Sequence, residues 1–207
     1  AFLQLGKIAD AFLIHNREIH MRVDDSVTRV IDRKNYPIRR SRGYAPNPVI
    51  SPLSLPQILA TGAELKNTFC LTRDHYAFIS HHIGDMENFE TLQSFEEAIT
   101  HYQKLFRINP ELIASDMHPD YLSTRFAAQF AQNMNIQNIQ IQHHHAHLAA
   151  CLADNQYNKD DPVIGLCYDG TGYGTDGAIW GGEILVGGYA QYQRKFHLRY
   201  VPLPGGD

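Results

Sequence analysis

Two histidines and an aspartate are the side chains of this chain whose types and spacing could do chemistry. His143 and His147 are four residues apart, and His147–Ala153 is free of Gly and Pro and predicts a helix. On a helix, residues four apart share one face, so the two imidazole rings can converge. Asp169 follows the apolar run 163–168, which is typical of a buried strand. Histidine pairs at this spacing commonly bind a transition metal, and a carboxylate usually completes the ligand set.

The residues after Asp169 are rich in glycine and predict a turn. In this turn, the backbone N–H groups of Gly170, Thr171 and Gly172 are candidates for binding phosphate oxygens. Each signal also has a simpler explanation, because a histidine-rich run can be a solvated loop or an expression tag, and an Asp before Gly often only caps its turn. The histidines lie inside the chain, between a strand pattern and a helix pattern, which argues against a tag. Together, the features favour a metal site beside a phosphate-binding loop.

Composition and charge place the chain among soluble globular proteins. Its 207 residues are 43% hydrophobic and 19% charged, which is ordinary for that class, and no apolar run approaches the roughly 20 residues of a membrane span. The net charge of −4 gives no electrostatic reason to expect a nucleic acid partner. Three cysteines without a CxxC pair indicate reduced thiols and a cytoplasmic protein. Because the sequence starts without Met inside an apolar stretch and ends on a turn-like segment, we expect it to be part of a longer protein.

Residue patterns in the first quarter of the chain predict strands and then a linker. Residues 11–15 and 18–23 are predicted as paired strands, and a further strand follows the polar turn at 24–26. Four prolines between residues 44 and 56 resist regular structure, so this segment is predicted as an irregular linker and a domain boundary.

Three arginines lie close together just before the prolines: Arg39, Arg40 and Arg42. The arginine side chain suits bidentate contact with phosphate or carboxylate. A solvated edge strand protected by its charges is the alternative, and the sequence favours neither.

After the prolines, strand and helix patterns alternate. Strands are predicted at 58–71 and 76–80 around a turn at 73–75, and then at 112–116, 139–141, 163–168 and 184–186. Helices are predicted at 92–106, with Ser94 and Glu97 as a capping pair, from Pro119 to Met134, and at 147–153. This alternation predicts an α/β layer architecture with helices on the faces of a mixed sheet.

Eight short motifs follow one another along the chain. They are DDSV at 24–27, RRSRGYAP at 39–46, GAELKNTF at 62–69, HHIGD at 81–85, HPDY at 118–121, the histidine run at 143–147, the glycine-rich run at 169–174 and PLPGGD at 202–207. The series closely resembles the carbamoyltransferases that mature nickel–iron hydrogenases, the HypF family, and it covers nearly the whole chain.

The resemblance implies a division of the chain into domains. Residues 1–45 would close a YrdC-like α/β domain, and residues 46–56 would be the Pro-rich linker. Residues 57–207 would form the first part of a Kae1-like domain of the actin/Hsp70-like ATPase fold (ASKHA). The second lobe of that domain would lie outside this sequence, as would the family's N-terminal acylphosphatase and zinc-finger modules.

The resemblance also implies a reaction. In the family, carbamoyl phosphate is hydrolysed and its carbamate is adenylated by ATP, for which Mg²⁺ is a further expected cofactor. The carbamoyl group of this adenylate is then transferred to the C-terminal cysteine of a partner maturation protein, a HypE-like protein. The product becomes the cyanide ligand of the hydrogenase iron. By similarity, His143, His147 and Asp169 are metal ligands, and they suit Fe or Zn without choosing between them.

Further site residues follow from the same resemblance. Gly170, Thr171 and Gly172 lie where nucleotide phosphates are held, and Gly205, Gly206 and Asp207 lie where the ribose is approached. Ser26, Arg39 and Arg42 are candidates for contact with the adenylate on the YrdC-like side. Three alternatives stay open: an actin-fold O-carbamoyltransferase, a tRNA threonylcarbamoyl transferase, and a metal-binding module without catalysis. The DDSV, RRSRGYAP and GAELKNT segments favour the hydrogenase enzyme.

Overall fold

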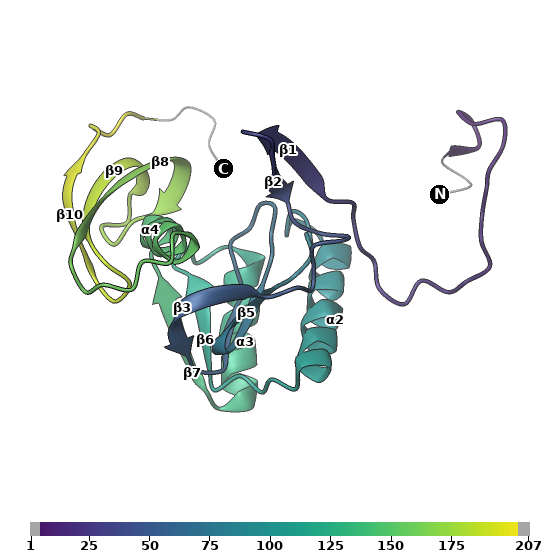
Figure 1. Ribbon diagram of the computed structural model, residues 1–207, viewed down its shortest axis with the longest axis horizontal. Helices are drawn as coiled ribbons and strands as arrows, with labels where there is room; N and C mark the ends of the chain where they lie inside the picture. The colour runs from purple at the N-terminus through teal and green to yellow at the C-terminus, as the bar shows by residue number, and fades with distance from the viewer. Residues whose placement is uncertain (1–4, 203–207) are drawn as a thin grey trace.

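The computed structural model describes residues 5–202, which form three sheets and three longer helices (Figure 1). A five-stranded mixed sheet has the strand order β3-β5-β4-β6-β7. A separate three-stranded antiparallel sheet has the order β10 (Tyr192–His197), β9 (Ile179–Gly187) and β8 (Val163–Tyr173), and a two-stranded hairpin joins β1 (Val27–Ile31) to β2 (Lys34–Arg39). In Figure 1, helix α4 (His143–Asp154) lies between the five-stranded and the three-stranded sheets.

The five-stranded sheet confirms the predicted mixed α/β architecture. Its strands are β3 (Val49–Leu55), β4 (Ile58–Ala60), β5 (Cys70–Ile79), β6 (Leu112–Asp116) and β7 (Gln137–Ile141). Strands β4, β6 and β7 are parallel, whereas β5 is antiparallel to both β3 and β4. Parallel neighbours need long crossovers, and here these contain α2 (Phe89–Phe106) and α3 (Leu122–Met134).

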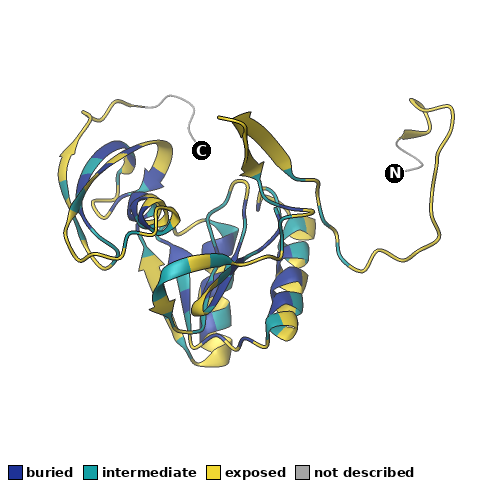
Figure 2. Ribbon diagram, viewed as in Figure 1, coloured by how far each residue is buried: buried dark blue, intermediate teal, exposed yellow. Residues whose placement is uncertain are grey.

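The main hydrophobic core lies between the five-stranded sheet and helices α2 and α3 (Figure 2). Phe95 of α2 contacts both Phe69 and Phe126 edge to face, with ring centroids 5.7 and 5.1 Å apart. Ile113 of β6 is fully buried in the same core. Because successive strand residues point to opposite faces, the neighbouring Ala114 is directed to the other face of the sheet.

Helix starts differ from the predicted ones in detail. Asn88, not the pair Ser94 and Glu97, caps α2, and its side chain accepts a hydrogen bond from the Thr91 N–H at 2.9 Å. A cap must precede the first helical residue to satisfy its free N–H groups, and Ser94 already lies in the second turn. The helix predicted from Pro119 begins at Leu122.

The predicted hairpin of 58–71 and 76–80 around a turn at 73–75 was wrong, because the antiparallel pair is formed by β4 (Ile58–Ala60) and β5 (Cys70–Ile79) instead. Residues 73–75 continue the single strand β5, and the connection to β4 is the irregular segment 61–69. Gly62 has φ +71° and Lys66 has φ 51°, values that interrupt a strand. Within this segment, the Asn67 side-chain amide donates to the carbonyls of Thr61 and Ala63.

The prediction that the prolines keep residues 46–56 irregular was wrong, because residues 49–55 form strand β3. This strand is at the edge of the five-stranded sheet, where a Pro costs no ladder hydrogen bond. Its pairing with β5 shifts register between Ile50 and Leu55, the interval that contains Pro52. The presence of β3 does not test the domain boundary predicted in this segment, which stays a prediction.

The two strands predicted at 11–15 and 18–23 are absent: the described residues 9–25 contain no strand. Leu13 is fully exposed, and Ile14 and Ile19 are 66% and 72% exposed. Alternating apolar residues form a strand only where a partner strand accepts them, and no described strand pairs with residues 9–25. The later strand is present as β1 (Val27–Ile31), which pairs with β2 (Lys34–Arg39).

Limited proteolysis should therefore cut the segment 9–25 first, rather than the Pro-rich segment. Exposed backbone without ladder hydrogen bonds is the preferred target of proteases, and Arg17 and Arg22 offer trypsin sites there. Mass spectrometry of the early products should show cleavage after these residues. Early cleavage inside β3 (49–55), with protection of 9–25, would contradict this assignment.

The last strands form a sheet of their own instead of extending the first one. They are β8 (Val163–Tyr173), β9 (Ile179–Gly187) and β10 (Tyr192–His197). Leu148 and Leu152 of α4 (His143–Asp154) pack in a second core with Cys167, Trp180 and Leu185 of this sheet. Within residues 5–202, no helix is long and apolar enough to cross a membrane.

Candidate metal centre

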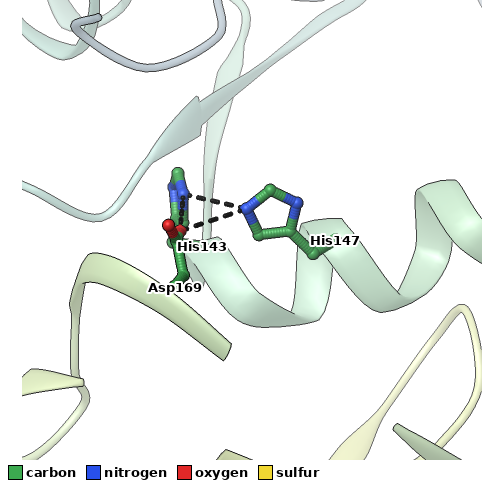
Figure 3. Close-up of side chains that lie close together, drawn as sticks. All are labelled: His143, His147 and Asp169. Carbon is green, nitrogen blue, oxygen red and sulfur yellow. Dashed lines mark hydrogen bonds and ion pairs between the residues drawn. The ribbon is translucent and has the colours of Figure 1, made fainter. Parts of the chain in front are cut away.

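Helix α4 and strand β8 bring the three predicted ligands together (Figure 3). His143 and His147 project from successive turns of α4 with their Nε2 atoms 3.2 Å apart. One oxygen of Asp169, Oδ2, lies 3.0 Å from His143 Nε2 and 3.2 Å from His147 Nε2. The arrangement is a triangle of three potential ligand atoms.

The dimensions of this triangle fit a transition metal ion. Zinc bonds to imidazole nitrogen and carboxylate oxygen are about 2.0–2.2 Å long, so two such ligands at tetrahedral angles are roughly 3.3–3.5 Å apart. The observed separations of 3.0 to 3.2 Å are close to this spacing. The His147 side chain is 57% exposed and that of Asp169 is 35% exposed, which leaves the open side accessible to a substrate. Three protein ligands with an open position are the pattern of a catalytic metal site.

Asp116, at the end of β6, belongs to this centre and was missed by the sequence analysis. Its Oδ2 accepts a hydrogen bond from Nδ1 of His143 at 2.8 Å, and its side chain is only 6% exposed. A carboxylate that accepts from one ring nitrogen fixes the tautomer in which the other nitrogen is free for a metal. The sequence does contain a signal for Asp116. It is an acidic residue at the end of a predicted strand, and the histidines follow the next predicted strand along the chain. Because the ends of parallel strands meet at one edge of a sheet, this position could have been expected to lie beside the histidines.

The protonation equilibria of the site follow from these contacts. The hydrogen bond to Asp116 raises the pKa of His143, although burial opposes it. Burial raises the pKa of Asp169, but the Gly170 N–H and the charges of the two histidines outweigh it, so the net shift is downward. Asp169 is therefore a carboxylate at neutral pH, as a metal ligand must be.

Replacing Asp116 by Asn should weaken metal binding by about 10–100-fold, the usual cost of losing an outer-shell partner. Both Asp116 oxygens act as acceptors, since Oδ1 also accepts the His118 N–H at 2.8 Å, and Asn has only one acceptor oxygen. Isothermal titration with Zn²⁺ measures the effect. The matched control is Asp120→Asn, which removes an exposed carboxylate paired with Arg125. If the two variants bound Zn²⁺ with equal affinity, Asp116 would have no role in the metal centre.

The start of α4 is fixed by residues on either side of the ligand pair. Gln142 caps the helix by accepting the His145 N–H at 3.0 Å, and its side-chain amide donates to the Tyr173 carbonyl of β8. His144 is fully buried, and burial lowers its pKa. It fills the space over Gly172, where a β-carbon would lie 2.7 Å from the His144 ring. Helix α4 is thus attached to the second sheet on the face next to the ligands.

The glycine-rich segment does not form the predicted turn. Residues 170–172 belong to β8, which continues to Tyr173, and the turn follows at 174–177, where Gly177 has φ +77°. Between Tyr168 and Gly172 the register with β9 shifts, so that Asp169 lies in a bulge. Bulges re-aim side chains next to active sites, and this one turns Asp169 toward α4. The Gly170 N–H donates to Asp169 Oδ1 at 2.7 Å.

A cavity of about 410 Å³ borders the histidines on the side of the five-stranded sheet. Ala60 and Ala114 of the sheet and Ala146 and Ala150 of α4 line it together with His143. Protein interiors are normally close-packed, and small side chains on both walls keep this space open. Its volume is within the usual range for small-molecule sites.

The remaining predicted site residues are elsewhere. The Ser26 hydroxyl donates to the Arg42 carbonyl at 2.8 Å and accepts from the Ser41 N–H. Arg39 and Arg42 pair with Asp24 and Asp25, respectively. These contacts hold the end of the β1–β2 hairpin together. The adenylate contacts predicted for Ser26, Arg39 and Arg42 stay predictions. Gly205, Gly206 and Asp207 lie outside the described residues.

Comparison with protein families identifies the chain. Residues 54–154 match a family model described as the HypF Kae1-like domain. Residues 165–207 match one described as the second subdomain of the carbamoyltransferase Kae1-like domain. The chain belongs to the HypF family. Its metal-ligand triangle joins the two matched regions, since both histidines lie in the first and Asp169 in the second. This confirms the Kae1-like fold predicted from the sequence, whereas the YrdC-like assignment of residues 1–45 stays a prediction.

Curated HypF proteins align with nearly the whole length of the chain. Carbamoyltransferase HypF2 of Cupriavidus necator is 48% identical over 99% of the chain and 25% of its own length. The probable carbamoyltransferase HypF of Methanocaldococcus jannaschii is 38% identical over 99% of the chain and 27% of its length. The chain thus spans about a quarter of the length of these relatives.

Solved HypF structures share the fold. A crystal structure of full-length HypF in the phosphate- and nucleotide-bound form is 50% identical with a TM-score of 0.88, covering 99% of this chain and 26% of that one. HypF of T. kodakarensis is 44% identical with a TM-score of 0.81, covering 89% of this chain and 24% of that one.

Proposed function

We propose that the chain is the part of a hydrogenase-maturation carbamoyltransferase that contains the metal centre of the transfer reaction. The triangle of His143, His147 and Asp169 carries this proposal, because its dimensions and its open side suit a metal ion that a substrate can reach. The names of the HypF relatives support the carbamoyl group as the group transferred.

The proposed overall reaction uses carbamoyl phosphate and ATP. Carbamoyl phosphate is hydrolysed to carbamate and phosphate, and the carbamate displaces pyrophosphate from ATP to form carbamoyl-adenylate. The sulfur of the cysteine at the C-terminus of a HypE-like partner protein then forms a bond to the carbamoyl carbon. The bond from that carbon to the AMP oxygen breaks, and the thiol proton goes to solvent or a base. We place adenylation in a YrdC-like domain that ends near residue 45, and transfer in the Kae1-like domain that begins near residue 57.

Several residues of this chain have proposed tasks in the transfer step. When bound, Fe or Zn would polarise the carbamoyl oxygen or neutralise the phosphate of the departing AMP. His143, His147 and Asp169 would hold that ion, and Asp116 keeps the His143 ring in the required tautomer. The cavity between α4 and the sheet provides room beside these ligands for the transferred group. Mg²⁺ is proposed for the ATP.

The nucleotide contacts of Gly170, Thr171 and Gly172 are also proposals. Gly170 and Thr171 are exposed in the bulge next to Asp169, which is a suitable place for a phosphate near the metal. The phosphate- and nucleotide-bound state of one solved relative supports a nucleotide in this family. Because the Gly170 N–H already donates to Asp169, Thr171 is the better donor candidate.

Pyrophosphate exchange into ATP tests the first half of the function. In the full-length natural protein, we expect exchange of pyrophosphate into ATP that requires carbamoyl phosphate. Addition of a peptide that ends in cysteine should then consume the adenylate and release AMP. Exchange without carbamoyl phosphate, or AMP release that does not need the thiol, would contradict the proposal. A threonine-dependent exchange would instead favour the tRNA threonylcarbamoyl alternative.

A further inference from the structure

A buried ion pair joins Glu183 of β9 to Arg194 of β10, and the proposed reaction does not use it. The Glu183 side chain is only 1% exposed, and its Oε2 accepts a hydrogen bond from Nε of Arg194. Cys167, the register partner of Glu183 on β8, packs in the core that this sheet forms with α4. Because directly opposite residues of a ladder share one face, the carboxylate lies on the face that covers α4.

The guanidinium group of Arg194 is held by two further side chains. Its Cζ lies 4.0 Å from the centre of the Trp180 ring, and its Nη1 donates to Oδ2 of Asp176 at 3.1 Å. The indole N–H of Trp180 donates to the other oxygen of Asp176 at 2.8 Å. Oε2 of Glu183 therefore faces a fixed partner, and its other oxygen, Oε1, is left for a second donor.

The second donor is the backbone N–H of Gly181, whose nitrogen lies 3.2 Å from Oε1 of Glu183. Gly181 is the residue of β9 opposite the bulge, since the residues on either side of it, Trp180 and Gly182, pair with β8 and Gly181 does not. A β-carbon at Gly181 would lie 3.2 Å from the carbonyl oxygen of Asp169. The backbone that Glu183 binds is thus in contact with the bulge that contains the metal ligand.

The Gly181 N–H is directed toward β8. The carbonyl of the next residue, Gly182, accepts the Leu198 N–H at 2.8 Å on the opposite side, where β10 lies. Hydrogen bonding to one neighbour alternates along an antiparallel strand, so the Gly181 N–H belongs on the β8 side. A free N–H there could pair with a carbonyl of β8 and draw the bulge into a regular ladder. The Glu183 carboxylate occupies this N–H instead.

A buried ion pair is a weak source of stability, because the lost hydration of both charges offsets their attraction, and its best-attested use is to fix a register. The pair here lies next to a register shift. We propose that Glu183 is a positioning residue of the metal centre, whose carboxylate binds the Gly181 N–H and so maintains the bulge that directs Asp169 toward the two histidines. This inference rests on the metal site proposed above.

Two double variants of the metal-free 207-residue chain, titrated with Co²⁺, test the proposal. Glu183→Gln with Arg194→Leu removes both charges and keeps a side-chain oxygen for the Gly181 N–H. Glu183→Leu with Arg194→Leu removes both charges and that oxygen as well. Neither variant leaves an unpaired buried charge, which would by itself be strongly destabilising. The visible absorption of the bound Co²⁺ reports both its affinity and the geometry of its ligands.

The two double variants should behave differently. The one that contains Glu183→Gln should keep the Co²⁺ spectrum and affinity of the parent. The one that contains Glu183→Leu should bind Co²⁺ about tenfold more weakly, in line with outer-shell substitutions, and should change the spectrum because the carboxylate ligand shifts. The single variant Glu183→Asp keeps the charge but withdraws the oxygen from Gly181 by one methylene, so it should change the spectrum too. It decides the question if the variant with Glu183→Leu does not fold.

The matched control removes an exposed ion pair on another element, by Asp120→Asn with Arg125→Leu, and should bind Co²⁺ as the parent does. If the variant with Glu183→Leu differed from the parent no more than the variant with Glu183→Gln, the positioning role would be overturned while the metal site remained. A parental spectrum in Glu183→Asp would overturn it equally. If the parent itself bound no Co²⁺, the metal site would fail and the inference with it.

Discussion

Replacement of both His143 and His147 by Ala should abolish binding of the single transition metal ion that we expect in the chain. The two imidazoles supply two of the three ligand atoms in the triangle, and loss of an outer-shell partner alone already costs about 10–100-fold in affinity. We therefore expect the double variant to bind Zn²⁺ more than about a hundredfold more weakly than the parent. Isothermal titration and elemental analysis of the dialysed protein measure this.

The control for this experiment has to be an exposed histidine outside α4. His144 is unsuitable, because it is fully buried and its loss would open a cavity over Gly172. His75 and His197 are exposed and lie on other elements, so a variant with both replaced by Ala matches the number of imidazoles removed. Equal loss of metal in this variant would mean that binding is nonspecific.

The second large effect is expected from Asp169→Asn. The two carboxylate oxygens have separate partners, because Oδ1 accepts the Gly170 N–H and Oδ2 faces both histidines. Asn keeps an oxygen for Gly170 and places an amide without charge toward the histidines, where a metal ion prefers a carboxylate. In the longest natural protein that contains this sequence, adenylation should persist, whereas transfer to the thiol should be lost.

Two measurements separate the roles of Asp169. Carbamoyl-phosphate-dependent pyrophosphate exchange follows adenylation, and the thiocarbamate formed on a cysteine peptide follows transfer. Thermal unfolding should show near-parental stability, since the Gly170 hydrogen bond is retained. Transfer at the parental rate would leave Asp169 with only its structural hydrogen bond to Gly170.

The local chemistry of the site could be predicted because it depends on short spacing. His143 and His147 needed only a helix to share a face, and the helix starts at His143. Asp169 was predicted as a ligand, but its local structure was not. It lies in a bulge within β8 rather than in a turn after a strand. The bulge, in which three residues of β8 lie opposite one residue of β9, depends on contacts between distant segments, which the periodicity of the sequence does not record.

Contacts between distant segments account for most of what the sequence did not predict. Asp116 is 27 positions from His143, and only the parallel pairing of β6 and β7 brings them together. The separate second sheet depends on Leu148 and Leu152 facing β8 rather than the first sheet. Strand β3 was missed because its prolines count against a strand unless the strand is known to be at an edge.

The central claim is that His143, His147 and Asp169 bind one metal ion between α4 and β8. X-ray absorption spectroscopy of the Zn²⁺-loaded chain tests this most directly, since it reports the type and distance of each ligand. We expect two imidazole nitrogens and carboxylate or water oxygens at about 2.0–2.2 Å from the zinc, with no sulfur. Zinc–sulfur scattering near about 2.3 Å, from Cys70, Cys151 or Cys167, or a shell without imidazole nitrogens, would contradict it.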